Sequence, residues 1–245
     1  MRLINCLLHN FTKKVKNKML KTNFYLKRKL KKPVLIEALP GIGFVGYLIG
    51  AHLIQEFNAK KICEFISPNL PNLTFIEKGE IKYSFNALYE VTKTGLDRDL
   101  IILFGNTQAS SSIDQYRFYS KILDLTKQMG CKEVIAIGGL KRDKLPSPLN
   151  IYCTATSKEI LMRALNLGAK TLYGKVFGAA GVLPGLAKLK GLNGLCILVD
   201  TLGLYPDASA AQLALRFLSN YLNIPIEIKK FEKSLKWALT FLSNF

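Results

Sequence analysis

The sequence contains few acidic residues, few histidines and no long apolar run. Its 245 residues include 17 acidic side chains and two histidines, against 35 Lys and Arg. No stretch reaches the roughly 18–20 apolar residues that a membrane-spanning helix needs. Residues 1–10 are too polar for the apolar region of a secretory signal. These absences argue against a membrane or secreted protein, and we expect a cytoplasmic one.

The cysteines lack the spacing of a metal or disulfide framework. There are five, an odd number, and no two form a CxxC pair. Cys63, Cys153 and Cys196 lie in apolar, strand-like runs, where a thiol behaves as a small hydrophobic side chain. We therefore predict no disulfide, no metal site and no cofactor.

Catalytic constellations are also missing. The histidines are His9 and His52, and neither a G-x-S-x-G motif nor a P-loop lysine is present. Asp200 ends an apolar strand and is the best-placed single carboxylate, although an acid there commonly caps a helix or organises a loop. Asp207 has a clear capping position. Without a partner base we predict no catalytic residue and a protein that is not an enzyme.

The positive charge is concentrated at one end of the chain. Residues 1–36 hold eleven of the 35 basic residues and none of the acidic ones. We predict a flexible basic arm over residues 1–32 and a single α/β domain over residues 33–245 that ends in a helix. The arm is the one expected route to nucleic acid, and a solvated Lys-rich extension is the simpler interpretation. Met19 offers an alternative start, which leaves the status of residues 1–18 open.

The spacing of apolar residues alternates between strand-like and helix-like along the chain, without a repeat. The predicted strands are residues 34–39, 61–66, 73–76, 81–91, 100–104, 134–137, 151–155, 172–177 and 195–199. Helices are predicted over residues 44–54, 118–129, 183–189, 207–218 and 229–243, and Thr156 with Glu159 forms a capping box for a short further helix. This alternation indicates an α/β fold, in which a mostly parallel sheet is covered on both faces and the hairpin at residues 73–91 is an antiparallel addition. We expect functional loops at residues 40–46, 105–112, 138–149 and 200–207, beyond the carboxyl ends of strands.

The first of these loops has two interpretations. Gly41, Gly43 and Gly46 match G-x-G-x-x-G between a strand and a helix, and Glu64 follows 18 residues after Gly46. This pattern is typical of a dinucleotide site. Pro40 stiffens the turn, however, Glu64 lies in the middle of its predicted strand, and no hydride-transfer chemistry follows. The alternative, which we favour, is that Gly43 and Gly46 allow close packing of strand and helix.

Five segments in order carry a resemblance to a known family. They are residues 33–46, Gly105-Asn106-Thr107-Gln108, Ile137-Gly138-Gly139, residues 185–191 and residues 202–207. Over residues 30–226 the chain resembles the proteasome assembly chaperone family, in particular its archaeal members. The resemblance implies a three-layer α/β/α fold, homo-oligomerisation, and help in assembling the proteasome α-subunit ring without catalysis.

The C-terminal helix supplies a candidate partner interface. Some family members end in a hydrophobic–Tyr–any tail that docks between α subunits, but Asn244 stands at the penultimate place here, so we expect no such docking. The helix carries two apolar stripes, whereas an exposed helix needs one. The first stripe is Phe231, Leu235, Ala238 and Leu242, and the second is Trp237, Phe241 and Phe245. The second stripe is the candidate interface, and deeper burial is its alternative. The leading hypothesis is therefore a non-catalytic assembly chaperone or scaffold, and the alternative is a nucleotide- or phosphate-binding enzyme or sensor that uses residues 41–46.

Overall fold

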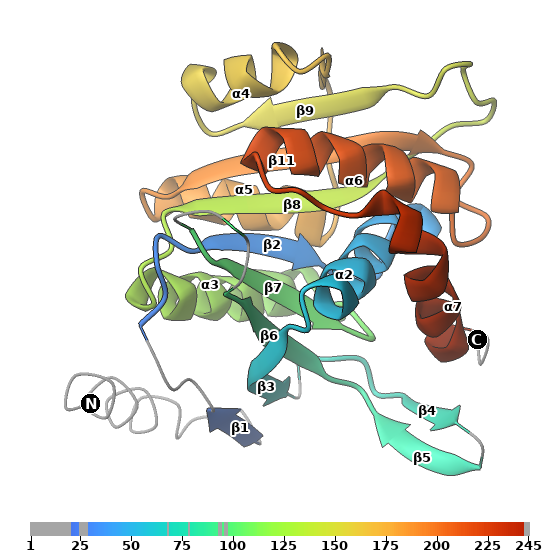
Figure 1. The fold of residues 1–245 in the computed structure, drawn as a ribbon. Helices are drawn as coiled ribbons and strands as arrows, with labels where there is room; N and C mark the ends of the chain where they lie inside the picture. Colours follow the sequence, from blue (N-terminus) through green and yellow to red (C-terminus); the bar gives the residue numbers. More distant parts are fainter. Residues whose placement is uncertain are drawn as a thin grey trace.

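The fold has three layers, in which one large sheet lies between two layers of helices (Figure 1). The computed structural model describes residues 21–24, 29–67, 69–77, 79–92, 95 and 98–242. The strands are β1 Lys21–Phe24, β2 Val34–Ala38, β3 Lys60–Ile66, β4 Thr74–Glu77, β5 Glu80–Tyr83, β6 Asn86–Val91, β7 Leu100–Gly105, β8 Glu133–Lys141, β9 Ile151–Ala155, β10 Lys170–Thr171 and β11 Asn193–Thr201. The helices are η1 Ile42–Phe44, α2 Val45–Glu56, α3 Ser112–Gln128, α4 Lys158–Leu165, α5 Ala179–Leu189, α6 Ala208–Leu222, η2 Ile228–Lys230 and α7 Phe231–Leu242.

The sheet has a parallel centre with antiparallel strands on its flanks. Its order is β1-β3-β6-β7-β2-β8-β11-β9-β10, and the neighbours β7, β2, β8 and β11 are parallel. On one flank β6, β3 and β1 are each antiparallel to the preceding strand, and on the other β9 is antiparallel to β11. The central strands are almost continuously apolar because both of their faces are buried.

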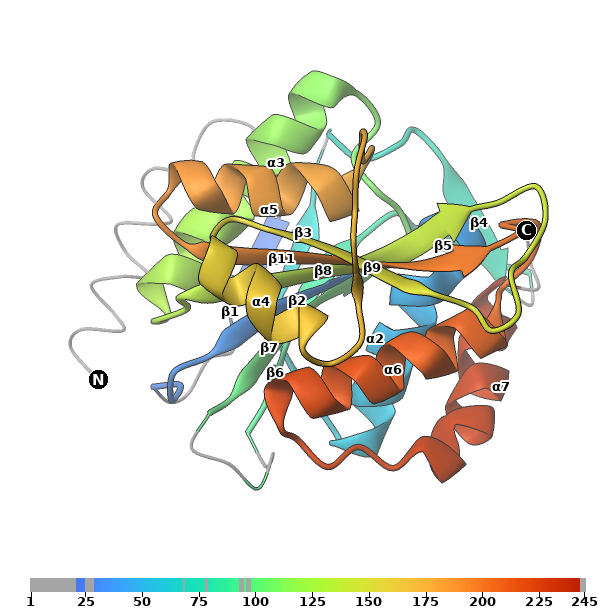
Figure 2. The same cartoon turned by 90° about the horizontal axis from the view of Figure 1, so that it is seen from above.

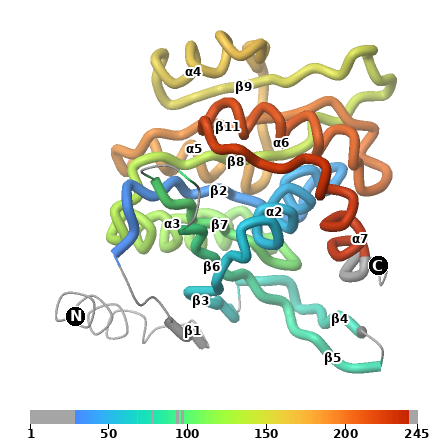
Figure 3. Tube along the Cα trace, in the orientation of Figure 1, coloured from blue at the N-terminus to red at the C-terminus, as the bar shows by residue number. Residues whose placement is uncertain are grey.

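Helices cover both faces of the sheet, as the sequence predicted. Figure 2 shows α3 and α5 on one side of the sheet and α2, α6 and α7 on the other. Alternate residues of β2 face the two layers, so that Leu35 packs with the α3 and α5 layer while Val34 and Ile36 pack with the opposite one. Helices α2 and α7 lie side by side although they come from opposite ends of the sequence (Figure 3). The predicted α/β/α sandwich is confirmed.

The helix caps confirm one prediction and correct another. Asp207 caps α6 as predicted, because its Oδ1 accepts a hydrogen bond of 2.9 Å from the Ala210 N–H. The capping box assigned to Thr156 is wrong. Ser157 caps α4 by accepting from the Ile160 N–H, and the Thr156 hydroxyl accepts from the Gly194 N–H of β11 instead. The competing donor, the Gly194 N–H, lies on a strand that is distant in sequence, so local spacing did not reveal it.

The predicted strand over residues 81–91 is two strands that belong to different sheets. β5 pairs with β4 in a separate two-stranded antiparallel hairpin, as predicted, and β6 joins the main sheet beside β7. Between them, the Asn106 side chain accepts from the Phe85 N–H and donates to the Tyr83 carbonyl. These side-chain bonds replace the pairing that a continuous strand would have made.

Two further strand predictions needed correction. Only Lys170–Thr171 forms a strand near the predicted residues 172–177, and those residues form a loop in which Tyr173 and Phe177 are largely exposed. Their apolar character suggested burial where none occurs. Conversely, Gly138 and Gly139 lie inside β8 and pair with β11, although the paired glycines had suggested a strand end. A Cβ on Gly139 would lie 2.4 Å from the Ile42 carbonyl oxygen, so glycine there permits the close approach of η1.

Candidate functional site

The loops after β2, β8 and β11 meet at the carboxyl edge of the parallel strands. The Asp207 N–H donates to the Gly43 carbonyl at 2.9 Å, and the Arg142 N–H donates to the Thr201 carbonyl at 2.8 Å. The Thr201 hydroxyl also donates to Asp207 Oδ2 at 2.7 Å. Three loops that are far apart in sequence are therefore held together by their own backbone and side chains.

The glycine loop is packed against these neighbours. Gly43 has a φ of 64°, and a Cβ there would lie 2.7 Å from Thr201 Oγ1. A Cβ on Gly46 would lie 2.4 Å from the Ile137 carbonyl oxygen of β8. Gly41 is less confined, with Gln108 Nε2 at 3.7 Å from its would-be Cβ. Contacts within the chain thus explain why glycine is needed at positions 43 and 46. Binding of a ligand at this loop stays a prediction.

Glu64 does not lie beside the glycine loop. It is on β3, which β6 and β7 separate from β2 in the sheet order. Its carboxylate forms an ion pair with Lys61 at 2.7 Å and accepts a hydrogen bond from the Tyr83 hydroxyl. The spacing that suggested a ribose-binding acid therefore places this acid on a different part of the sheet.

Asp200 organises a loop. Its buried carboxylate forms an ion pair with Arg142 at 2.6 Å and accepts from the backbone and side-chain N–H groups of Asn150. Burial alone would raise its pKa, but the hydrogen bonds from Arg142 and Asn150 outweigh burial and lower the pKa of Asp200. The carboxylate stays ionised and fixes the β8–β9 loop to the end of β11.

Gln108 provides a further tie that sequence reasoning missed. Its Nε2 donates to the Pro40 carbonyl at 2.6 Å, and its Oε1 accepts from the Ala179 N–H at the start of α5 at 3.1 Å. One side chain thus connects the loop before η1 with α5, which lies in the helix layer that also contains α3. The segment was visible as a family-like block, but its role depends on residues 68 and 71 positions away.

His52 is a core histidine. Its Nδ1 lies 2.9 Å from the Ser234 hydroxyl, and its ring packs against Phe231 of α7. Burial, aided by nearby Lys230, lowers the pKa of His52 to about 4, so the ring is neutral and joins α2 to α7. His9 lies outside the described residues. Within the residues that the structure describes, no group of three or more His, Cys, Asp or Glu side chains is arranged to hold a metal ion.

Glu37 is a buried acid that sequence analysis did not single out. It lies on β2 among apolar residues and is 1% exposed, and its Oε1 accepts from the Leu39 N–H at 2.9 Å. Its Oε2 has no partner among the described residues, and the same holds for the buried Tyr119 hydroxyl. Burial raises the pKa of Glu37 to about 8, which keeps it protonated at neutral pH. The sequence feature that could have indicated this buried acid is a single Glu within the otherwise apolar residues of β2.

The candidate interface on the last helix is described only in part. Trp237 is half-buried and stacks on Phe104, with ring centroids 6.4 Å apart. This contact packs α7 onto the sheet. The side chain of Phe241, and Phe245 altogether, lie outside the described residues, as do residues 243–244 of the tail. A partner interface at this stripe stays a prediction.

Exposed apolar side chains lie on the locked loops at the carboxyl edge. We call Ile42, Leu202, Leu204 and Tyr205 the carboxyl-edge patch. Leu204 is 70% exposed and Tyr205 is 80% exposed. A Cβ on Gly203 would lie 2.8 Å from Ile42 Cγ2, so the two loops of the patch touch. Apolar side chains on a fixed backbone lose little entropy on binding, which suits a surface for protein docking.

The fold and the carboxyl-edge patch define a class of protein: a three-layer α/β/α domain whose sheet-edge loops are locked by internal contacts and present apolar side chains outward. The profile of the PAC2 family matches residues 35–236, and the chain belongs to this family. No described helix has the length and apolarity needed to cross a membrane.

Known proteins match almost the whole chain. "Uncharacterized protein MJ1210" of Methanocaldococcus jannaschii is 32% identical over 218 residues, covering 88% of this chain and 83% of that protein. The crystal structure of Pyrococcus furiosus PbaB, described as an archaeal proteasome activator, is similar with a TM-score of 0.80 and 29% identity, covering 91% of this chain and 97% of PbaB. PbaA of the same organism, described as an archaeal homolog of proteasome-assembly chaperone, shares the fold with a TM-score of 0.72 and 23% identity over 91% of this chain and 90% of PbaA.

Proposed function

We propose that this protein is a non-catalytic assembly chaperone or scaffold that binds proteasome α subunits, self-associates and acts in the cytoplasm. The observation that carries the proposal is the likeness to PbaB over nearly the full length of both chains. The site agrees with this role, because Asp200, Asp207 and Gln108 each hold a loop in place. Among the described residues, these groups serve the architecture of a binding surface.

The carboxyl-edge patch is the surface that we assign to the α subunits. Leu204 and Tyr205 are the most exposed members of the patch. Interface energy is concentrated in a few apolar and aromatic side chains that become fully desolvated, with Tyr prominent among them. Asp207 and Thr201 fix the backbone on either side of these residues, so little ordering is needed on binding.

Replacing Leu204 with Glu is expected to weaken binding to proteasome α subunits by about tenfold or more, because a charge would be desolvated at the centre of the contact. Binding can be measured by calorimetry with purified α subunits, and α-ring formation can be followed by native mass spectrometry with and without this protein. The matched control is Leu189→Glu, since Leu189 is 82% exposed at the end of α5.

Each outcome bears on a different part of the proposal. Equal losses in both variants would assign the effect to added charge and not to the carboxyl-edge patch. Absence of wild-type binding, together with unchanged ring formation, would refute the proteasome role.

A further inference from the structure

The β4–β5 hairpin turns apolar side chains to solvent. Thr74 pairs with Tyr83 and Ile76 pairs with Ile81 in the register of the two strands. Cross-strand partners, and residues two apart on a strand, share one face of a sheet. We call these four residues the hairpin face. Ile76 is 52% exposed, Ile81 is 73% exposed and Tyr83 is 52% exposed.

The chain anchors this hairpin firmly at its root. The Tyr83 hydroxyl donates to Glu64 Oε1 at 3.2 Å, and Asn106 Nδ2 donates to the Tyr83 carbonyl at 3.1 Å. In the described part of the chain, β4 and β5 pair only with each other. A two-stranded sheet without cover is marginally stable in water. Packing of the hairpin face against another surface would therefore stabilise the hairpin.

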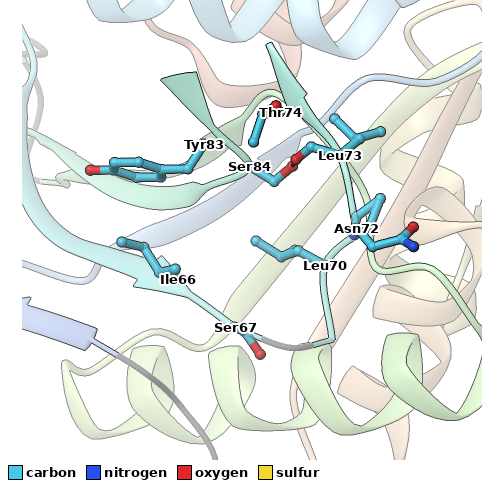
Figure 4. A pocket seen from close by; sticks show the side chains of 9 residues that line it. Ile66, Ser67, Leu70, Asn72, Leu73, Thr74, Tyr83 and Ser84 are labelled. Carbon is cyan, nitrogen blue, oxygen red and sulfur yellow. Dashed lines mark hydrogen bonds between the residues drawn. The ribbon is translucent and has the colours of Figure 1, made fainter. Parts of the chain in front are cut away.

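A shallow cavity of about 360 Å³, wide open to solvent, lies beside the root of the hairpin. Its apolar walls are Ile66, Leu70, Leu73 and Tyr83, and Figure 4 shows Tyr83 and Ile66 on one side with Leu73 on the other. Thr74 and Tyr83 belong both to the cavity wall and to the hairpin face. The apolar surface is thus continuous from the tip, near Ile81, into the cavity.

The charge of the hairpin distinguishes between possible occupants. Residues 74–84 contain two Glu and two Lys, and they are locally neutral in a chain of net charge +18. A neutral segment offers an acidic partner no attraction of opposite charge. Two copies of the chain carry the same net charge, so a contact between them is favoured where the local charge is balanced. The hairpin meets this condition.

We propose that the hairpin face packs against the same region of a second copy of this chain, with Ile81 of each copy entering the cavity of the other. Each strand has four residues, a length of roughly 13 Å. Two hairpins that lie antiparallel side by side therefore place each tip near the root of the other. Such a contact is reciprocal and closes with twofold symmetry. The inference rests on the self-association in the proposed function and names its surface.

Replacing Ile81 with Lys tests the inference by sedimentation velocity across a range of concentrations. The wild-type chain is expected to sediment as an assembly, and the variant is expected to shift to species of half that mass or less. Ile76→Lys should act in the same direction, since Ile76 is the cross-strand partner of Ile81. Ile81 is 73% exposed, so the substitution leaves the fold intact, and circular dichroism checks this.

The matched control is Met162→Lys, because Met162 is 52% exposed, as is Ile76, and lies on α4 beside the opposite edge of the sheet. This variant should keep the wild-type mass. Full assembly of both hairpin variants would overturn the inference, and so would equal dissociation of the control. A monomeric wild-type chain would refute self-association itself. If that monomer bound α subunits and Ile81→Lys abolished the binding, the hairpin face would belong to the α subunit and the proposed function would survive.

Discussion

Replacing Gly46 with Ala is expected to cost about 3 kcal/mol or more of unfolding free energy, the upper end of the range for overpacked cores. A Cβ at this position would lie 2.4 Å from the Ile137 carbonyl oxygen and 3.6 Å from the Leu39 carbonyl oxygen. Both oxygens belong to the backbone. Ile137 lies in the middle of β8, and β8 itself lies between two parallel strands, β2 and β11. Since neither atom is the end of a flexible side chain, relief requires α2 to move away from the sheet.

The same substitution elsewhere provides a matched control. Gly185 lies inside α5, and nothing is within 4 Å of its would-be Cβ. Gly185→Ala should therefore be neutral or stabilise the protein by up to about 1 kcal/mol through helix propensity. Chemical denaturation of both variants measures the difference. Equal stability of the Gly46→Ala variant and the wild-type protein would show that the glycine is not required for packing. That result would favour the alternative hypothesis, in which the loop binds a ligand.

Replacing Glu37 with Gln is expected to remove a strong pH dependence of stability. Burial raises the pKa of Glu37 from 4.5 to about 8 in the folded protein. The folded state then holds a proton that the unfolded state releases above pH 4.5. The stabilising effect of this proton is fully present below pH 4.5, and it is lost as pH rises from there to about 8, at up to ~1.4 kcal/mol per pH unit.

The measurement is the difference in unfolding free energy between the wild-type and Glu37→Gln proteins at several pH values. The unfolding free energy of the variant should rise relative to that of the wild type between pH 5 and pH 8, by a few kcal/mol in total. The difference should level off above pH 8. Gln keeps the oxygen that accepts from the Leu39 N–H. Glu232→Gln, at an exposed position of α7, is the control for the loss of one carboxyl group elsewhere on the chain. Parallel profiles for the wild-type and Glu37→Gln proteins would contradict the prediction.

The sequence patterns identified the centre of the fold well. Buried parallel strands need nearly continuous apolar runs, and β2, β7 and β11 have them, so their positions were visible from local residues. The Asp207 cap was equally local, because the side chain bonds a backbone N–H three residues away. Patterns failed where a distant partner competed, as for Thr156, whose hydroxyl accepts from Gly194 of β11.

The sequence predicted which loops share the carboxyl edge of the sheet, but not the contacts that join them. The expected loops do meet at the carboxyl edge, and Gly43 and Gly46 occupy the crowded positions that their packing interpretation required. The roles of Gln108 and Glu37 were not predictable, because each depends on neighbours that other elements bring to it. Exposure of Leu204 and Tyr205 was likewise invisible, since an apolar residue in a loop gives no local sign of whether it is covered.

By itself the sequence determined most of the central strands and helices, the parallel centre of the sheet and the family, because these depend on the period of apolar residues and on short ordered segments. Only the tertiary structure decided the strand order, which separates Glu64 from the glycine loop by two strands. It alone also split residues 81–91 between two sheets and exposed the apolar face of the β4–β5 hairpin. The physical reason is that strand pairing and burial are settled between residues far apart in the chain, where competition among distant partners outweighs local preference.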